Sequence, residues 1–126
     1  MIILDTCALL WLAGNPSALP AEVLARVDEE PIVAVSAISA FEVSQKWLAR
    51  KLELPVPARE WWDGVVAHHR LEVLPVDSAV AFRATELPPV HRDPADRFII
   101  ATAQRYGAPV ATSDARFAEY GIRVLW

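Results

Sequence analysis

The sequence predicts an α/β fold in which a five-stranded parallel sheet is flanked by helices. Five short runs rich in apolar and β-branched residues are typical of strands, at residues 2–4, 32–35, 72–76, 109–112 and 122–125. Six segments with a helical pattern lie between them, at residues 7–13, 21–29, 39–52, 58–69, 78–86 and 94–106. Alternation of strand and helix is typical of a parallel sheet. Three of the strands are nearly all apolar, as expected when helices cover both faces of the sheet.

The length and composition indicate one domain that spans residues 1–126. The chain has 126 residues, of which 54% are hydrophobic, enough for a real core and too many for a disordered tail. Its net charge of -4 argues against a protein that holds nucleic acid on a broad basic surface. A nuclease is still compatible with this charge, because metal-binding acids contribute to it.

The cysteine count and the first residues favour a cytoplasmic protein. Cys7 is the single cysteine, so it cannot form an internal disulfide, which fits a reducing compartment. No basic segment precedes an apolar stretch at the start, so we expect no signal peptide. The longest apolar run, residues 7–13, is too short to span a membrane, and we expect no membrane partner.

Four acidic residues each stand at the start of a predicted helix: Asp5, Glu42, Asp96 and Asp114. A helix that follows a parallel strand starts at the carboxyl edge of the sheet. A helix that leads into a parallel strand runs antiparallel to it, so its N-terminus lies at the same edge. All four carboxylates are therefore expected at one edge, where open α/β sheets bind ligands if the strand order reverses. If the first and fourth strands pair there, Asp5 lies beside Asp114.

Crowded carboxylates repel each other and resist desolvation, so a cluster of them is best explained by a bound cation. Hard oxygen ligands select Mg²⁺ or Mn²⁺, and these ions support phosphoryl chemistry. We therefore expect a site for Mg²⁺ (or Mn²⁺).

Helix capping is the structural alternative for each acid. Asp5 and Asp114 are placed as N-caps would be, and Ser39 with Glu42 fits the capping-box pattern S-x-x-E. Capping explains each residue alone more easily than it explains all of them together.

Two acids lie close together at the start of the last long helix. Asp93 precedes Pro94, which is typical of an N-cap followed by proline, so we interpret Asp93 as structural. Asp96 is then surplus to capping, which favours a functional role for it.

Three basic residues are candidate contacts for a phosphate backbone. Lys46 lies four residues after Glu42, a spacing that is equally typical of an exposed ion pair. Arg97 and Arg116 each lie within two residues of a candidate acid, so both could reach a substrate backbone.

The histidines and Cys7 receive structural interpretations. His68, His69 and His91 show no metal-ligand spacing with one another, and we interpret them as structural or exposed. Cys7 is interpreted as an apolar residue of its helix.

Tryptophan is abundant, with five in 126 residues. Trp61 and Trp62 are neighbours on a helix, about 100° apart, so both are hard to bury in one small core. Exposed aromatic side chains around Trp47 would mark a protein interface. The core and interface interpretations both stay open.

Four segments carry a resemblance to the PIN-domain family, and more narrowly to VapC-type toxins of toxin–antitoxin pairs. They are residues 4–11 (LDTCALLW), 36–43 (SAISAFEV), 91–103 (HRDPADRFIIATA) and 112–117 (TSDARF). Any one of them is weak evidence, but their order and spacing along the whole chain are specific.

The resemblance implies a Mg²⁺- or Mn²⁺-dependent endoribonuclease with a five-stranded parallel sheet. It implies that the acidic site is Asp5, Glu42, Asp96 and Asp114, and that Thr6, Thr112 and Ser113 lie beside these acids and help to hold ligands or water. It also implies a cognate antitoxin that covers the acidic pocket, and a homodimer. Trp47, Trp61 and Trp62 are our candidates for the antitoxin interface.

The expected reaction is hydrolysis of an RNA phosphodiester by a metal-activated water. A dehalogenase-type phosphatase would need a second acid where Cys7 stands. A receiver domain would need an acidic pair after the first strand and a late lysine, but the last lysine is Lys51. A catalytically silent PIN-fold module that only binds a protein shares every fold feature and stays open as the alternative.

Overall fold

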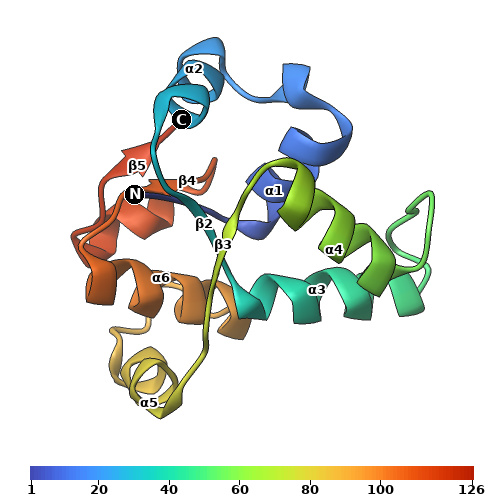
Figure 1. The fold of residues 1–126 in the computed structure, drawn as a ribbon. Helices are drawn as coiled ribbons and strands as arrows, with labels where there is room; N and C mark the ends of the chain where they lie inside the picture. Colours follow the sequence, from blue (N-terminus) through green and yellow to red (C-terminus); the bar gives the residue numbers. More distant parts are fainter.

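The computed structural model describes all residues, 1–126, and contains an all-parallel sheet with the strand order β3-β2-β1-β4-β5. The strands are β1 (Ile2–Leu4), β2 (Val33–Ser36), β3 (Glu72–Leu74), β4 (Val110–Ala111) and β5 (Val124–Leu125). The α-helices are α1 (Thr6–Gly14), α2 (Ala21–Glu29), α3 (Ala37–Leu48), α4 (Ala58–His68), α5 (Ser78–Glu86) and α6 (Pro94–Tyr106) (Figure 1). Two short 3₁₀ helices, η1 (Pro16–Ala18) and η2 (Ala115–Tyr120), complete the fold. The predicted α/β class and five-stranded parallel sheet are confirmed.

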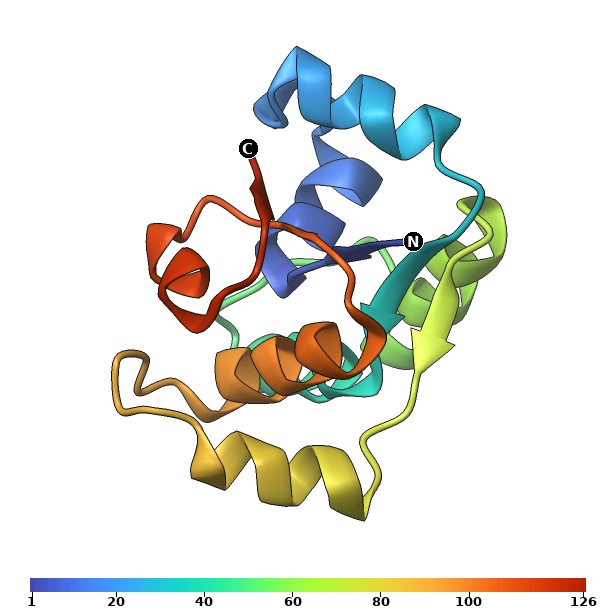
Figure 2. The same cartoon turned by 90° about the vertical axis from the view of Figure 1, so that its left-hand side faces the viewer.

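Each face of the sheet has its own hydrophobic core. Ile2 and Leu4 of β1 pack with residues of α1, α2, α3 and α4, whereas Ile3 packs with residues of α5, α6 and η2. Neighbouring side chains of a strand point to opposite faces, so one strand serves both cores. Figure 2 shows α1 and α2 above the strands and α5 and α6 below them. Burial on both faces explains why the strands are nearly all apolar.

β1 lies where the order of the strands reverses. The chain adds β2 and β3 on one side of β1, then adds β4 and β5 on its other side. β1 and β4 pair in parallel, with Leu4 opposite Ala111, and the Asp5 N–H donates to the Ala111 carbonyl at 3.1 Å. The pairing of the first and fourth strands that would bring Asp5 towards Asp114 is therefore present.

α3 begins two residues earlier than the sequence predicted. Ser36, the last residue of β2, is its N-cap, and the Ser36 hydroxyl accepts the Ile38 N–H at 3.1 Å. The predicted capping box is therefore wrong: Ser39 lies inside the helix, and Glu42 lies in its second turn rather than its first. None of the helices is both long enough and apolar enough to cross a membrane.

Candidate active site

A pocket of about 240 Å³ at the carboxyl edge of the sheet collects the four predicted acids. Its lining comes from the ends of β1 and β4 and from α1, α3 and α6. The lining residues are Asp5, Thr6, Cys7, Glu42, Lys46, Asp93, Asp96, Ser113 and Asp114. Asp5 and Asp114 are 109 positions apart in the sequence. They line the same pocket because the strand order places β1 beside β4.

Asp5 is both a helix cap and a member of the pocket. Its carboxylate accepts the Ala8 N–H at 2.7 Å and so caps α1, and the residue is 7% exposed. Burial raises the pKa of Asp5, while hydrogen bonds from Thr112 and Ala8 partly oppose this and the charge of Asp114 adds to it. The structural and functional interpretations of Asp5 are therefore compatible, because one carboxylate oxygen caps the helix and the group still faces the pocket.

Glu42 is held by a chain of hydroxyl groups. The Thr6 hydroxyl donates to Glu42 Oε1, and Thr6 Oγ1 lies 2.8 Å from Ser39 Oγ. A carboxylate only accepts, so Thr6 donates to Glu42 and accepts from Ser39. Burial raises the pKa of Glu42, against the hydrogen bond from Thr6 and the charge of Lys46, whose Nζ lies 3.9 Å from Oε2. Ser39 was expected to cap a helix, and it instead supports the Thr6 hydroxyl.

Among the acids of the pocket, Asp96 has the most strongly raised pKa. Burial, followed by the negative charges of Asp93 and Glu42, raises the pKa of Asp96 to about 7. Asp93 itself caps α6, because its Oδ1 accepts the Ala95 N–H at 2.9 Å. The predicted N-cap at Asp93 is confirmed, and its charge also faces the pocket.

Asp114 is the opposite case, since donors surround it. Arg116 binds it through both sides of the guanidinium group, with Nε 3.0 Å from Oδ1 and Nη2 2.8 Å from Oδ2, and also through its backbone N–H. These bonds hold the pKa of Asp114 well below its usual range, with a further contribution from His91. Arg116 is thus bound to one acid of the pocket, and its contact with a substrate stays a prediction.

His91 is a residue of the site that the sequence reasoning missed. Its side chain is 2% exposed, and its Nε2 lies 2.8 Å from Asp114 Oδ2 and 3.1 Å from Asp96 Oδ2. His91 is buried, in agreement with its structural interpretation. That interpretation did not include its contact with two of the candidate acids. No local spacing reveals this contact, because it joins a loop, a helix and the end of a strand.

Arg97 does not face the pocket. Its guanidinium group donates to backbone carbonyls of Ala84, Leu87, Pro88 and His91, at distances between 2.7 and 3.0 Å. The prediction that Arg97 reaches a substrate backbone is therefore wrong. Its hydrogen bonds instead hold the segment before α6 against the end of α5.

Three other predicted support residues do lie at the pocket or directly behind it. Lys46 and Ser113 are part of its lining, and the buried Thr112 accepts the Asp114 N–H at 3.0 Å. Cys7 lies in α1, as the sequence predicted, but it is exposed and lines the pocket, so it does not belong to the core.

The tryptophans divide between core and surface. Trp61 is 9% exposed and belongs to the core above the sheet, so it is not available as an interface residue. Trp47 and Trp62 are partly buried against that core. Trp62 also lines a surface hollow of about 330 Å³ between α3 and α4, together with Ala40, Ser44 and Arg59.

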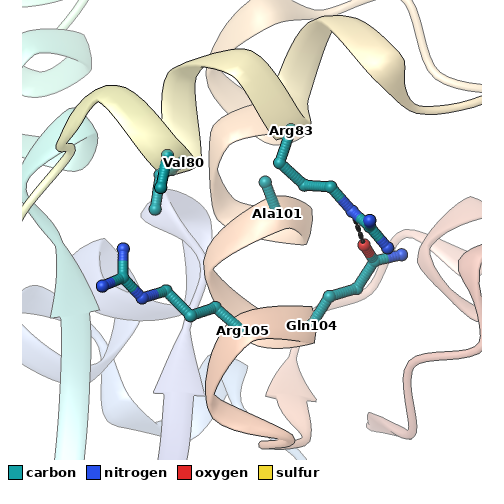
Figure 3. A pocket seen from close by; sticks show the side chains of 6 residues that line it. Val80, Arg83, Ala101, Gln104 and Arg105 are labelled. Carbon is teal, nitrogen blue, oxygen red and sulfur yellow. Dashed lines mark hydrogen bonds between the residues drawn. The ribbon is translucent and has the colours of Figure 1, made fainter.

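A hollow of about 360 Å³ lies between α5 and α6 (Figure 3). It shares no lining residue with the acidic pocket. Arg83 Nε donates to Gln104 Oε1 there at 2.9 Å, and Arg105 pairs with Asp77 at 2.6 Å. No carboxylate belongs to its lining, so it offers no ligand set for a cation.

The donor set of the acidic pocket fits a hard divalent cation. The four predicted acids are half-buried or buried, and burial is the main cause that raises the pKa values of Asp5, Glu42 and Asp96, with neighbouring negative charges adding to it. One carboxylate oxygen of Asp96 and one of Asp114 lie within 4.8 Å of each other. Oxygen-rich sets of this kind suit Mg²⁺ or Mn²⁺.

A parallel α/β sheet with an acidic pocket at its switch point defines the chain as a candidate metal-dependent phosphoryl-transfer protein. The PIN domain matches residues 2–122. Ribonuclease VapC22 of Mycobacterium tuberculosis is 31% identical over 122 residues, which cover 94% of this chain and 91% of the relative. The chain therefore belongs to the PIN-domain family, and its resemblance to VapC-type members is confirmed.

Solved structures share the fold at lower sequence identity. VapBC2 from Rickettsia felis, bound to a DNA fragment from its promoter, matches with a TM-score of 0.72 at 16% identity and covers 99% of this chain and 98% of that one. A toxin–antitoxin complex from Klebsiella pneumoniae matches with a TM-score of 0.67 at 22% identity and covers 100% and 97%. At these identities the likeness concerns the fold.

Proposed function

We propose that this chain is an endoribonuclease, the toxin of a VapBC-type toxin–antitoxin pair, which hydrolyses RNA phosphodiesters with Mg²⁺ or Mn²⁺. The observation that carries the proposal is the pocket that unites Asp5, Glu42, Asp96 and Asp114 at the switch point of the sheet. The similarity to Ribonuclease VapC22 over 94% of the chain supports RNA as the substrate.

Asp5, Glu42, Asp96 and Asp114 would hold the cation. When bound, such an ion acts as a Lewis acid on the phosphate and lowers the pKa of water, which supplies a nucleophile at neutral pH. The hydroxyl chain from Ser39 through Thr6 fixes one oxygen of Glu42, and the helix N-terminus of α1 fixes one oxygen of Asp5. These contacts orient the carboxylates before any ligand arrives, which is what an efficient site requires.

Lys46 and Arg116 are the cations best placed to contact the RNA backbone. Both side chains are about half exposed, at 43% and 54%, and both lie at the acidic pocket. The ion pair of Lys46 with Glu42 is long and solvent-accessible, so a phosphate can recruit Lys46 at small cost. Arg116 is held to Asp114 by two side-chain bonds but is more than half exposed, so a phosphate can still reach its guanidinium group. Arg97 has no such role, because backbone carbonyls occupy its guanidinium group.

An antitoxin and a second copy of the chain are the proposed protein partners. The structural relative from Klebsiella pneumoniae is a toxin–antitoxin complex, which supports a cognate antitoxin here. Trp62 and the hollow beside it between α3 and α4, which is lined by apolar, polar and charged residues, offer a groove for an amphipathic partner helix. Phe41 and Leu48, seven residues apart on α3, are 59% and 71% exposed, and such a stripe favours self-association.

The alternative is a catalytically silent PIN-fold module that only binds its partner. Purified protein incubated with structured RNA and Mn²⁺, beside an Asp5→Asn variant and a chelator control, separates the two. The proposal expects metal-dependent internal cleavage by the wild type alone, because an amide is a weak ligand for a hard cation. Tight antitoxin binding without cleavage of any RNA would support the silent module instead.

A further inference from the structure

We infer that His91 is a positioning residue whose Nε2–H donates to Asp114 and fixes this carboxylate beside Asp96, and that His91 is not a metal ligand. The inference rests on the proposed function and deepens it, because it concerns how the acidic pocket is kept in shape. It assigns a role to a buried ring whose Nε2 lies within 3.1 Å of carboxylate oxygens of two of the acids.

Hydrogen bonds on both sides of the ring define the tautomer. The backbone N–H of Asp93 donates to His91 Nδ1 at 3.2 Å, so that nitrogen presents a lone pair and not a proton. Nε2 lies 2.8 Å from Asp114 Oδ2, and a carboxylate oxygen can only accept. The hydrogen bond to Asp114 therefore uses a proton on Nε2, and Asp96 Oδ2 lies 3.1 Å from the same nitrogen.

This tautomer is incompatible with ligation through Nε2. A metal would need the lone pair of Nε2, so the ring proton would have to move to Nδ1. There it would face the Asp93 N–H, and two donors would oppose each other in a buried place. Orienting the carboxylates is the role that leaves every polar atom of the ring paired, which buried polar groups require.

The surroundings of His91 hold the ring in this orientation. The His91 N–H donates to the Tyr120 hydroxyl at 2.7 Å, and that hydroxyl donates to Pro88 O at 2.7 Å. Arg97 Nη1 donates to the His91 carbonyl at 2.9 Å. The ring meets the buried Phe117 edge to face, with centroids 5.8 Å apart and planes at 87°. A side chain fixed this firmly can fix the carboxylates that it touches.

His91 also frees Asp96 from a competing task. In a capping box the acidic residue at the third helical position bonds back to the N–H of the N-cap. Asp93 is the N-cap of α6 and Asp96 occupies that third position, but the Asp93 N–H is already taken by His91 Nδ1. The carboxylate of Asp96 is therefore left to face the pocket.

The first test compares His91→Phe, which keeps the aromatic shape, with His91→Gln, whose amide nitrogen can still donate. Mn²⁺ affinity is measured by calorimetry, and kcat and KM for RNA cleavage are measured beside it, with melting curves in chelator to confirm folding. Loss of a group that orients metal ligands costs about 10- to 100-fold in metal affinity or activity. We expect this loss in His91→Phe and recovery of most of it in His91→Gln. His68→Phe is the matched control on the exposed surface of α4 and should behave as the wild type.

The second test needs no variant in the measured sample. Nitrogen-15 spectra of histidine-labelled wild-type protein are recorded with and without Mg²⁺, and the His91 signals are assigned from the two variants. A proton on Nε2 in both states supports the inference. A proton on Nδ1, or loss of the Nε2 proton on adding Mg²⁺, overturns it, as does a folded His91→Phe that binds Mn²⁺ and cleaves RNA like the wild type. Failure of the wild type itself to bind Mn²⁺ or cleave RNA would count against the proposed function instead.

Discussion

Asp93 and Asp96 lie within one turn at the start of α6, and the charge of Asp93 is the largest cause, after burial, of the raised pKa of Asp96. Asp93 stabilises α6 by capping it, and the negative charge of Asp93 disfavours the ionised form of Asp96. The pocket therefore stores unfavourable charge that a cation would relieve.

Replacing Asp96 by Asn should stabilise the metal-free protein. The substitution removes a buried charge that Asp93 and Glu42 oppose, so the melting temperature in chelator should rise at neutral pH. Millimolar Mn²⁺ should raise the melting temperature of the wild type by linkage and have little effect on Asp96→Asn. Equal Mn²⁺ shifts for the two proteins would count against Asp96 as a ligand.

The stability of the metal-free protein should depend on pH through Asp96. This carboxyl keeps its proton up to about pH 7 in the folded chain, whereas its ordinary value is 3.8. The folded state thus binds more protons between these values, and the free energy of unfolding should fall as pH rises through this window. Denaturant titrations in chelator from about pH 4.5 to about pH 7.5 measure this, and Asp96→Asn should flatten the slope.

The same proton should oppose the metal. Binding at Asp96 requires the ionised form, so the apparent Mn²⁺ affinity should rise about tenfold per pH unit below pH 7 and level off above it. Calorimetry in buffers of different ionisation enthalpy would report the released proton. An affinity that does not change with pH would show that Asp96 is already ionised or is not involved.

Activity should separate Asp93 from Asp96. Asn caps helices about as well as Asp, so Asp93→Asn should keep α6 intact and retain most RNA cleavage. Asp96→Asn should abolish it, because an amide is a weak ligand for Mg²⁺. An equal loss of activity in the two variants, with equal melting temperatures, would make Asp93 a fifth ligand.

The convergence of the four acids was predictable because topology alone places them. Any parallel sheet with strand order reversing at β1 brings the ends of β1 and β4 together, and the helix starts follow. Where α3 begins was harder to predict, since Ser36 and Ser39 both precede an apolar helical run and only the three-dimensional end of β2 selects Ser36.

Other contacts depend on packing between distant segments, which sequence spacing does not encode. His91 reaches Asp114 only because η2 and the segment before α6 pack together through Tyr120. Arg97 follows Asp96 directly, but neighbours on a helix point about 100° apart, so one faces the pocket and the other faces backbone carbonyls. The same angle of about 100° predicted that Trp61 and Trp62 would not both be buried. It did not predict that Trp61 would be the buried one.

Arg116 should compete with the metal for Asp114. The guanidinium group occupies both oxygens of this carboxylate and is 54% exposed, so the pair is worth at most about 1 kcal/mol. Arg116→Ala should therefore raise Mn²⁺ affinity by up to about fivefold while raising KM for RNA, because a phosphate contact is lost. Arg123→Ala, at the opposite edge of the sheet, is the control. Weaker Mn²⁺ binding in Arg116→Ala would show that Arg116 orients Asp114 for the metal instead of competing with it.

Trp61 and Trp62 should respond differently to truncation. Trp61 is buried in the core, so Trp61→Ala should lower the free energy of unfolding by about 3–5 kcal/mol. Trp62 is partly exposed beside the hollow between α3 and α4, so Trp62→Ala should retain the fold and weaken antitoxin binding by more than about 1 kcal/mol. Denaturant unfolding and calorimetric titration of the coexpressed antitoxin measure the two effects. If a folded Trp62→Ala binds the antitoxin with unchanged affinity, the antitoxin binds elsewhere. The hollow between α3 and α4 would then have lost its largest apolar side chain with no effect on binding.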